Sequence, residues 1–151
     1  MNNKAVFVKN QAQIKIIKEN GRLLATILDI LKGMVKEGVN SVDLEREFIK
    51  LCDKNEARPA CKGYAPYNMP PFPTGLCISV NNESVHCFPK KSKIFKGGDI
   101  VTIDTVIEKN SMFVDAAVSL VVEPSSSKEK DTDEYKKRQK IDISTIMVMN
   151  T

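Results

Sequence analysis

The chain has 151 residues, of which 42% are hydrophobic and 28% are charged, a composition typical of one globular domain. Its net charge of +4 is spread along the sequence, and no Lys/Arg-rich stretch alternates with aromatic residues, so nucleic acid is not an expected partner. No segment approaches the run of about 18 apolar residues that a membrane span requires, and the N-terminus lacks the apolar region and cleavage site of a signal peptide.

The cysteines indicate a reducing environment. They form no CxxC pair, and a chain of this size does not need a disulfide framework to fold. A structural zinc site from three of them and the histidine is disfavoured, because the spacings match no common zinc pattern. We therefore expect free thiols and a cytoplasmic location. The residues concerned are Cys52, Cys61, Cys77, Cys87 and His86.

Two helices are predicted at the start of the chain. Residues 11 to 36 carry apolar side chains at helical spacing, among them Leu24, Leu28 and Leu31. Gly38 follows this helix, and Asn40 is a typical N-cap for a second helix that ends near residue 55.

Residues 57 to 75 predict an irregular loop. They contain five prolines together with Tyr64, Tyr67 and Phe72, which is more aromatic surface than a simple surface excursion needs. Long loops inside compact domains are usually functional. We therefore favour a binding wall over a flexible excursion.

Three strands follow the loop. Residues 76–80, 100–107 and 112–122 are rich in β-forming side chains and are bounded by turn-forming sequence. The connection at residues 81–93 is rich in turn residues and contains the only histidine, His86.

The character of the sequence changes at Pro124. Three serines lead into a charged run that is typical of a solvated helix or of disorder, and the last eleven residues are again apolar. We therefore divide the chain into a domain at residues 1–123 and a divergent, charged tail at residues 124–151.

Two aspartates lie on the last two predicted strands. If the turn between these strands is Lys109 and Asn110, residues that face each other have numbers summing to 219. Asp104 and Asp115 then lie opposite each other on one face, with Cβ atoms about 4.5–5.5 Å apart.

Two carboxylates in that position repel each other, and their neighbours in the sequence are apolar. Either they share a proton or one or two divalent cations lie between them. The alternative is a hairpin on which Asp104 and Asp115 both point into solvent, and a change of one residue in the loop breaks the pairing.

At this point the sequence resembles the methionine aminopeptidases, and in particular their type I branch. The segment GDIVTID at residues 98–104, with Asp115 eleven residues later, is similar to that family's metal-binding hairpin. Three further segments match in the expected order, namely CKGYAPY at residues 61–67, CISVNN at 77–82 and VHCFP at 85–89. The resemblance extends from about residue 10 to residue 122.

The resemblance implies an α+β fold, one half of a pita-bread fold, in which helices pack on an antiparallel sheet. It implies that Asp104 binds one divalent metal ion and that Asp115 bridges two, the metals being cobalt, manganese, iron or zinc. The substrates are peptides with an N-terminal methionine. The pocket for the methionine side chain is formed by Cys61, Tyr64, Tyr67 and Cys77, and His86 contacts the substrate near the scissile bond.

The sequence also departs from the family. The spacing from Cys61 to Cys77 is longer than usual, and Val114 and Ala116 flank Asp115 where the family has glycine and a hydroxyl residue. The family's remaining ligands, one histidine and two glutamates, come from a C-terminal half that has no counterpart here. Two hypotheses follow, an aminopeptidase-like metallopeptidase and a catalytically inactive half-domain that binds metal or peptide weakly, forms a homodimer or pairs with another partner.

Overall fold

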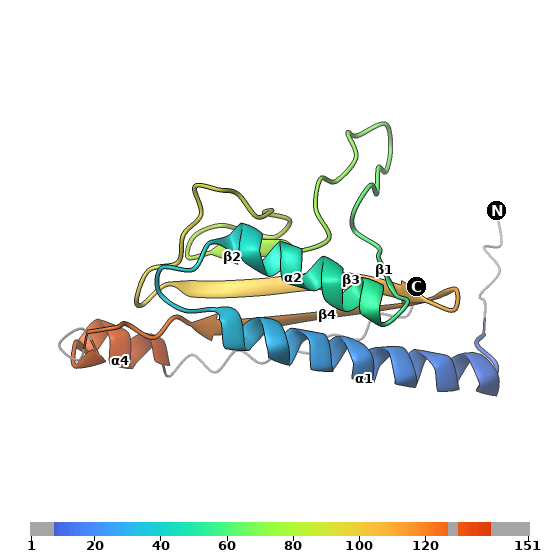
Figure 1. Cartoon of the computed structure of the whole chain (residues 1–151), viewed down its shortest axis with the longest axis horizontal. Coiled ribbons are helices and arrows are strands. Elements are labelled where there is room, and N and C mark those ends of the chain that lie inside the picture. Colours follow the sequence, from blue (N-terminus) through green and yellow to red (C-terminus); the bar gives the residue numbers. More distant parts are fainter. Residues whose placement is uncertain (1–7, 127–129, 140–151) are drawn as a thin grey trace, which may run out of the picture.

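The computed structural model describes residues 8–126 and 130–139, which form helices packed on one face of a four-stranded antiparallel sheet (Figure 1). The elements in chain order are α1 (Gln11–Met34), α2 (Ser41–Lys54), β1 (Arg58–Pro59), β2 (Cys77–Val80), β3 (Ile100–Lys109), β4 (Met112–Val121) and α4 (Asp133–Gln139). None of the described helices is long and apolar enough to cross a membrane.

Both long helices begin where the sequence provides a side-chain cap. The Asn10 side chain accepts a hydrogen bond from the backbone of Gln13, whose side chain accepts one from the Asn10 backbone, each at 2.9 Å. Asn40 caps α2 as predicted, since its Oδ1 accepts from Val42 N at 3.0 Å. Leu24, Leu28 and Leu31 of α1 are buried, which confirms the apolar face predicted for this helix.

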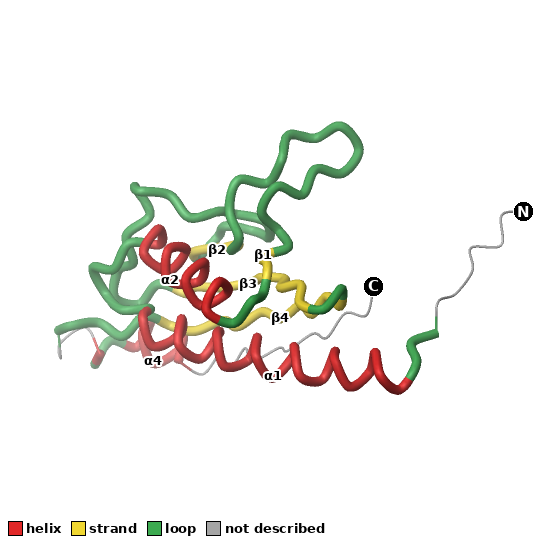
Figure 2. Tube along the Cα trace, turned by 45° about the vertical axis from the view of Figure 1, so that its right-hand side comes forward, coloured by secondary structure: helices red, strands yellow, loops and turns green. Residues whose placement is uncertain are grey.

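Strand β3 is the centre of the sheet. It pairs with β1 and β2 along one edge and with β4 along the other. Its burial alternates, so that Val101, Ile103, Thr105 and Ile107 are buried toward the helices. Figure 2 shows α1 and α2 together on that side of the sheet.

The predicted register of the β3–β4 hairpin is wrong. The turn is Asn110 and Ser111 rather than Lys109 and Asn110, and both turn residues have positive φ, at 53° and 59°. Two consecutive residues with positive φ are typical of the tight hairpin turn whose twist matches that of the strands. The numbers of two paired residues therefore sum to 221, because Lys109 pairs with Met112.

The loop between β1 and β2 is held firmly at both ends. Ala60 N donates to Val106 O at 2.8 Å, and the Glu45 carboxylate on α2 accepts from Gly75 N at 2.8 Å and Leu76 N at 3.0 Å. Gly75 has no room for a side chain, since a Cβ there would lie 2.8 Å from the Phe48 ring. Figure 1 shows the middle of the loop projecting from the sheet on the side away from α1.

The predicted tail lies partly outside the described residues. Its described part contains α4, whose Arg138 donates from Nη1 to Gly98 O at 2.6 Å. The division at residue 123 stays a prediction, and the apolar segment at residues 141–151 lies outside the described residues.

Asn20 joins α1 to the hairpin turn and carries a stability prediction. It is 2% exposed, and its Nδ2 donates to Lys109 O at 2.9 Å and to Met112 O at 3.1 Å. Asn20→Ala should lower the free energy of unfolding by about 1–3 kcal/mol, because two carbonyl groups lose their donor. Urea denaturation measures this, with the exposed Lys15→Ala on the same helix as control. An equal loss in both variants would contradict the assignment.

Candidate metal centre and adjoining cleft

Strand alternation places both aspartates on the face of the sheet opposite the helices. Asp104 lies between the buried Ile103 and Thr105 on β3, and Asp115 lies between the buried Val114 and Ala116 on β4. Since neighbouring side chains on a strand point to opposite faces, both aspartates point away from the helices. Both aspartates are half-buried, so this face of the hairpin is partly and not fully solvated.

Asp104 and Asp115 are diagonal neighbours on the sheet. The residues directly opposite Asp104 are Cys77 on β2 and Ala117 on β4, whereas Asp115 is opposite Val106. The corrected register changes the sum of partner numbers by two, and since side chains alternate with a period of two, the face is preserved. The prediction that the two carboxyl groups share a face is therefore confirmed.

The two carboxyl groups interact through their charges and a hydrogen bond. Burial raises the pKa of Asp115 to about 6, and the charge of Asp104 and the hydrogen bond that the protonated Asp115 carboxyl group donates to Asp104 add to the rise. Burial also raises the pKa of Asp104, although the positive charge of His86 and the hydrogen bond to Asp115 oppose it. The pair therefore holds a proton more readily than ordinary carboxyl groups, which is typical of two acids in one site.

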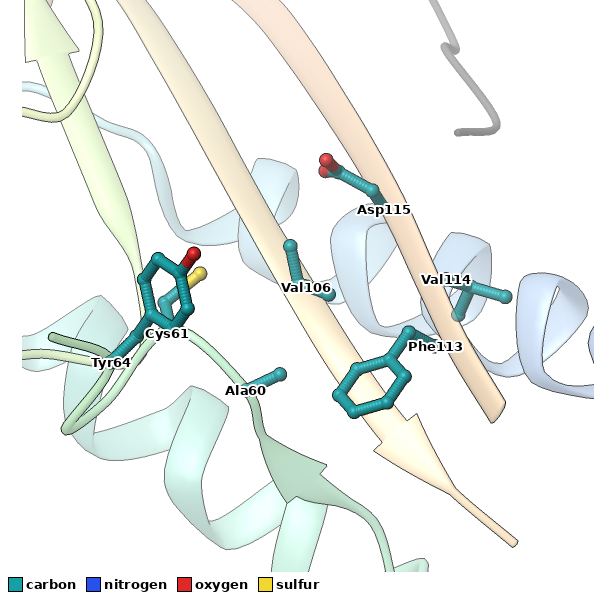
Figure 3. Close-up of a pocket in the computed structure, with 7 residues that line it drawn as sticks. All are labelled: Ala60, Cys61, Tyr64, Val106, Phe113, Val114 and Asp115. Atoms are coloured by element: carbon teal, nitrogen blue, oxygen red, sulfur yellow. The ribbon is translucent and has the colours of Figure 1, made fainter. Parts of the chain in front are cut away.

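A cleft of about 370 Å³ opens beside Asp115. Figure 3 shows Cys61 and Tyr64 on one side of it and Asp115 on the other, with Val106 of β3 between them. The lining is mostly apolar, which suits an uncharged side chain. The residues that line the cleft are Ala60, Cys61, Tyr64, Val106, Phe113, Val114 and Asp115.

The other residues predicted for the pocket lie around this cleft rather than in it. The side chain of Cys77 is 5% exposed, and its thiol donates a hydrogen bond to Cys61, which lowers the pKa of Cys61 and raises that of Cys77. Tyr67 is 98% exposed and does not line the cleft. His86 is exposed, close enough to Asp104 for its charge to act on that carboxyl group.

Sequence reasoning did not predict four residues of the lining as site residues, namely Ala60, Val106, Phe113 and Val114. Val106 and Phe113 each lie two positions from an aspartate on the same strand, so strand alternation alone places them on the same face. Ala60 follows the two-residue strand β1, which has no recognisable sequence pattern.

The donor set fits part of a divalent metal site. Two carboxylates are suitable ligands for hard or borderline divalent cations, and a cation between them offsets their repulsion. Within residues 8–126 and 130–139, no group of three or more His, Cys, Asp and Glu side chains is arranged to hold a metal ion. The described residues therefore provide two carboxylates and not a full coordination shell.

Comparisons with known proteins agree with this geometry. The sequence profile of metallopeptidase family M24 matches residues 15–144. The chain belongs to this family. It is 36% identical over 118 residues to a methionine aminopeptidase from Aquifex aeolicus, covering 78% of the chain and 46% of that relative. It is 32% identical over 121 residues to the methionine aminopeptidase of Escherichia coli K12, covering 78% of the chain and 43% of that relative.

Solved structures of the family give the same result. A methionine aminopeptidase from Thermotoga maritima superposes with a TM-score of 0.72 at 31% identity, covering 84% of the chain and 49% of that structure. A Xaa-Pro dipeptidase from Bacillus anthracis shares the fold alone, with a TM-score of 0.60 at 17% identity. The predicted half of a pita-bread fold is confirmed, and the chain spans about half the length of the relatives that it matches.

The carboxyl pair predicts how stability depends on pH in the absence of metal. Between pH 4 and pH 6 the folded protein holds a proton on Asp115 that the unfolded chain has released, so the free energy of unfolding falls as the pH rises. The expected loss is about 1–2 kcal/mol, since one pKa unit corresponds to about 1.4 kcal/mol and the group is partly solvated.

Asp115→Asn should remove this part of the slope, as measured by urea denaturation at several pH values with a metal chelator present. The exposed Asp53→Asn is the matched control and should keep the slope of the parent. Identical slopes in the parent and in Asp115→Asn would show that the two carboxyl groups do not share a proton in the folded protein.

Proposed function

We propose that this chain provides one half of a methionine aminopeptidase site. Asp104 would hold one divalent metal ion, cobalt, manganese, iron or zinc, and Asp115 would be shared by two such ions. The observation that carries the proposal is the carboxyl pair itself, two half-buried acids with raised pKa values, of which Asp115 lines an apolar cleft. Membership of metallopeptidase family M24 supports divalent metal dependence.

The proposed substrates are peptides with an N-terminal methionine, as in the relatives named methionine aminopeptidase. An unbranched thioether suits the cleft lined by Tyr64, Val106 and Phe113, because it is flexible and polarisable. The hydrogen-bonded thiols of Cys61 and Cys77 form the soft wall beside it. The proposed role of His86 is to contact the peptide group next to the first residue, and its support is that the charge of His86 acts on Asp104.

A bound divalent metal supplies a water molecule of lowered pKa and polarises the carbonyl group. The part of this chain is to hold the aspartate oxygens on a rigid sheet and to orient the methionyl end of the peptide. The apolar lining around Val106 excludes water from one side of the cleft. The four thiols are free in the structure, in keeping with the proposed cytoplasmic location.

A second candidate function is favoured by a specific observation. Two carboxylates leave most of the coordination of a metal to water, because the described residues contain no group of three ligands. Within the described sheet no strand pairs with the outer edge of β4, and a groove of about 180 Å³ runs between that edge and α1. On this reading the chain is a half-domain that binds metal or peptide weakly and is completed by a homodimer or another partner on that edge.

Metal binding tests the proposal directly. Manganese or cobalt at a few times the dissociation constant should raise the melting temperature by about 2–4 °C, corresponding to about 1 kcal/mol of linkage. Asp104→Asn should abolish most of the rise, because a carboxylate charge is lost, whereas the exposed Asp53→Asn should retain it. If neither metal shifts the melting temperature of the parent chain, the metal site is refuted.

Peptidase activity separates the two candidate functions. With cobalt or manganese present, the purified chain should release methionine from a Met-Ala-Ser peptide no faster than the metal alone, because the described residues supply two ligands and not a full set. A full-length methionine aminopeptidase under the same conditions is the positive control. Metal-dependent release that Asp104→Asn abolishes would instead show that the chain is a working enzyme.

A further inference from the structure

The connection between β2 and β3 carries His86 in an unusual backbone conformation. The backbone of His86 has φ of 64°, which lies in the left-handed region that residues other than glycine rarely adopt. Such a residue persists when its surroundings fix it. Its side chain is exposed, so the fixing contacts come from the backbone on either side.

Those contacts tie the connection to β2. The Ser79 hydroxyl donates to Ser84 O at 2.5 Å, two residues before His86. The backbone N–H of Ile78 donates to Cys87 O at 2.6 Å, one residue after it. Because β2 pairs with β3 at Cys77 and Asp104, these bonds set the position of His86 relative to the Asp104 carboxyl group.

Lys93 makes hydrogen bonds both to β2 and to the connection. Its side chain is 9% exposed, and the ammonium group lies 2.7 Å from Ile78 O, 2.6 Å from Glu83 Oε2 and 3.4 Å from Phe88 O. The three acceptors belong to β2, to the start of the connection and to its middle, two residues after His86. An ammonium group has three donors, so one cation joins all three segments.

Glu83 is fixed from two sides. Its Oε2 also accepts from Val80 N at 2.9 Å. Burial opposes ionisation of Glu83, but the hydrogen bond and the charge of Lys93 outweigh it and hold its pKa below the usual range. The backbone of Lys93 is in turn anchored to the start of α2, where Ser41 N donates to Lys93 O at 2.9 Å.

We propose that Lys93, with Glu83, is a positioning residue that locks the connection onto β2 and so holds His86 beside Asp104. The Lys93 side chain is 9% exposed and the Glu83 side chain 33% exposed, so the ion pair is partly buried. An apolar pair of similar size often stabilises a protein as well as an ion pair removed from water. An apolar pair cannot bind the carbonyl groups of Ile78 on β2 and of Phe88 in the middle of the connection. The inference rests on the proposed function for the importance of His86, but the positioning itself is a property of the chain alone.

His86 is the only histidine, so its imidazole gives single, assignable NMR signals. At pH 8.5 in the parent, Asp104→Asn should shift those signals, because the neighbouring charge is removed. In the Lys93→Met background the same substitution should shift them by less than half as much, and the Ile78 amide should exchange with deuterium at least tenfold faster. Lys93→Arg, which keeps the charge and several donors, should recover part of both effects.

Lys91→Met is the matched control, since Lys91 is exposed and two residues away, and it should behave like the parent. Glu83→Gln repeats the test with little change of volume if Lys93→Met does not fold. An undiminished response of His86 to Asp104→Asn, with unchanged Ile78 exchange, would overturn the proposal. Metal-induced stabilisation of the parent is measured separately, so failure of the positioning role and failure of the proposed function are distinguishable.

Discussion

The pairing of β3 on both of its edges is the constraint on which the rest of the molecule depends. A strand that is hydrogen-bonded along both edges cannot slide or rotate. Alternate residues therefore point to opposite faces of the sheet, one set buried against the helices and the other on the opposite face. Ile103 and Ile107 are buried against the helices, and Asp104 and Val106 are therefore presented on the other face. The cleft and the carboxyl pair both follow from that one alternation.

The two carboxyl groups of Asp104 and Asp115 repel each other, whereas the buried polar side chains in the described part of the fold have hydrogen-bond partners. No buried side-chain nitrogen or oxygen among the described residues lacks a hydrogen-bond partner. Asp104 and Asp115 nevertheless carry like charges in a half-buried position, and the pair reduces the repulsion by holding a proton. A divalent cation between the carboxylates offsets the same repulsion without protonation. Binding of a proton and binding of a metal ion at this site should therefore be mutually exclusive.

Elements dictated by local sequence were predictable, and elements dictated by tertiary pairing were not. The Asn40 cap and the apolar stripe through Leu24 and Leu31 depend on neighbouring residues, and both were predicted. The hairpin register was missed because Ser111 adopts positive φ, which nothing in its own chemistry demands. The face shared by the aspartates was still correct, since the error in the sum of partner numbers is an even number.

The site shows the same division. The motif residues Cys61 and Tyr64 line the cleft, whereas the position of Tyr67 in the projecting part of the loop depends on backbone geometry that no local pattern reveals. Lys93 and Glu83 are ten residues apart in the sequence, and the Lys93 ammonium group binds both the Glu83 carboxylate and a carbonyl group on β2. A charge pattern alone does not distinguish such a partly buried pair from two solvated side chains.

The firm anchoring of both ends of the loop between β1 and β2 has an evolutionary consequence. Ala60 is tied to β3 and Gly75 to α2, so the residues between them contribute little to the alignment of the sheet. Closing a longer loop between fixed ends costs little, about 0.6 kcal/mol for each doubling of its length. This segment is therefore a place where the protein can gain, lose or exchange sequence over generations, and so reshape the wall of the cleft while the carboxyl pair stays where it is.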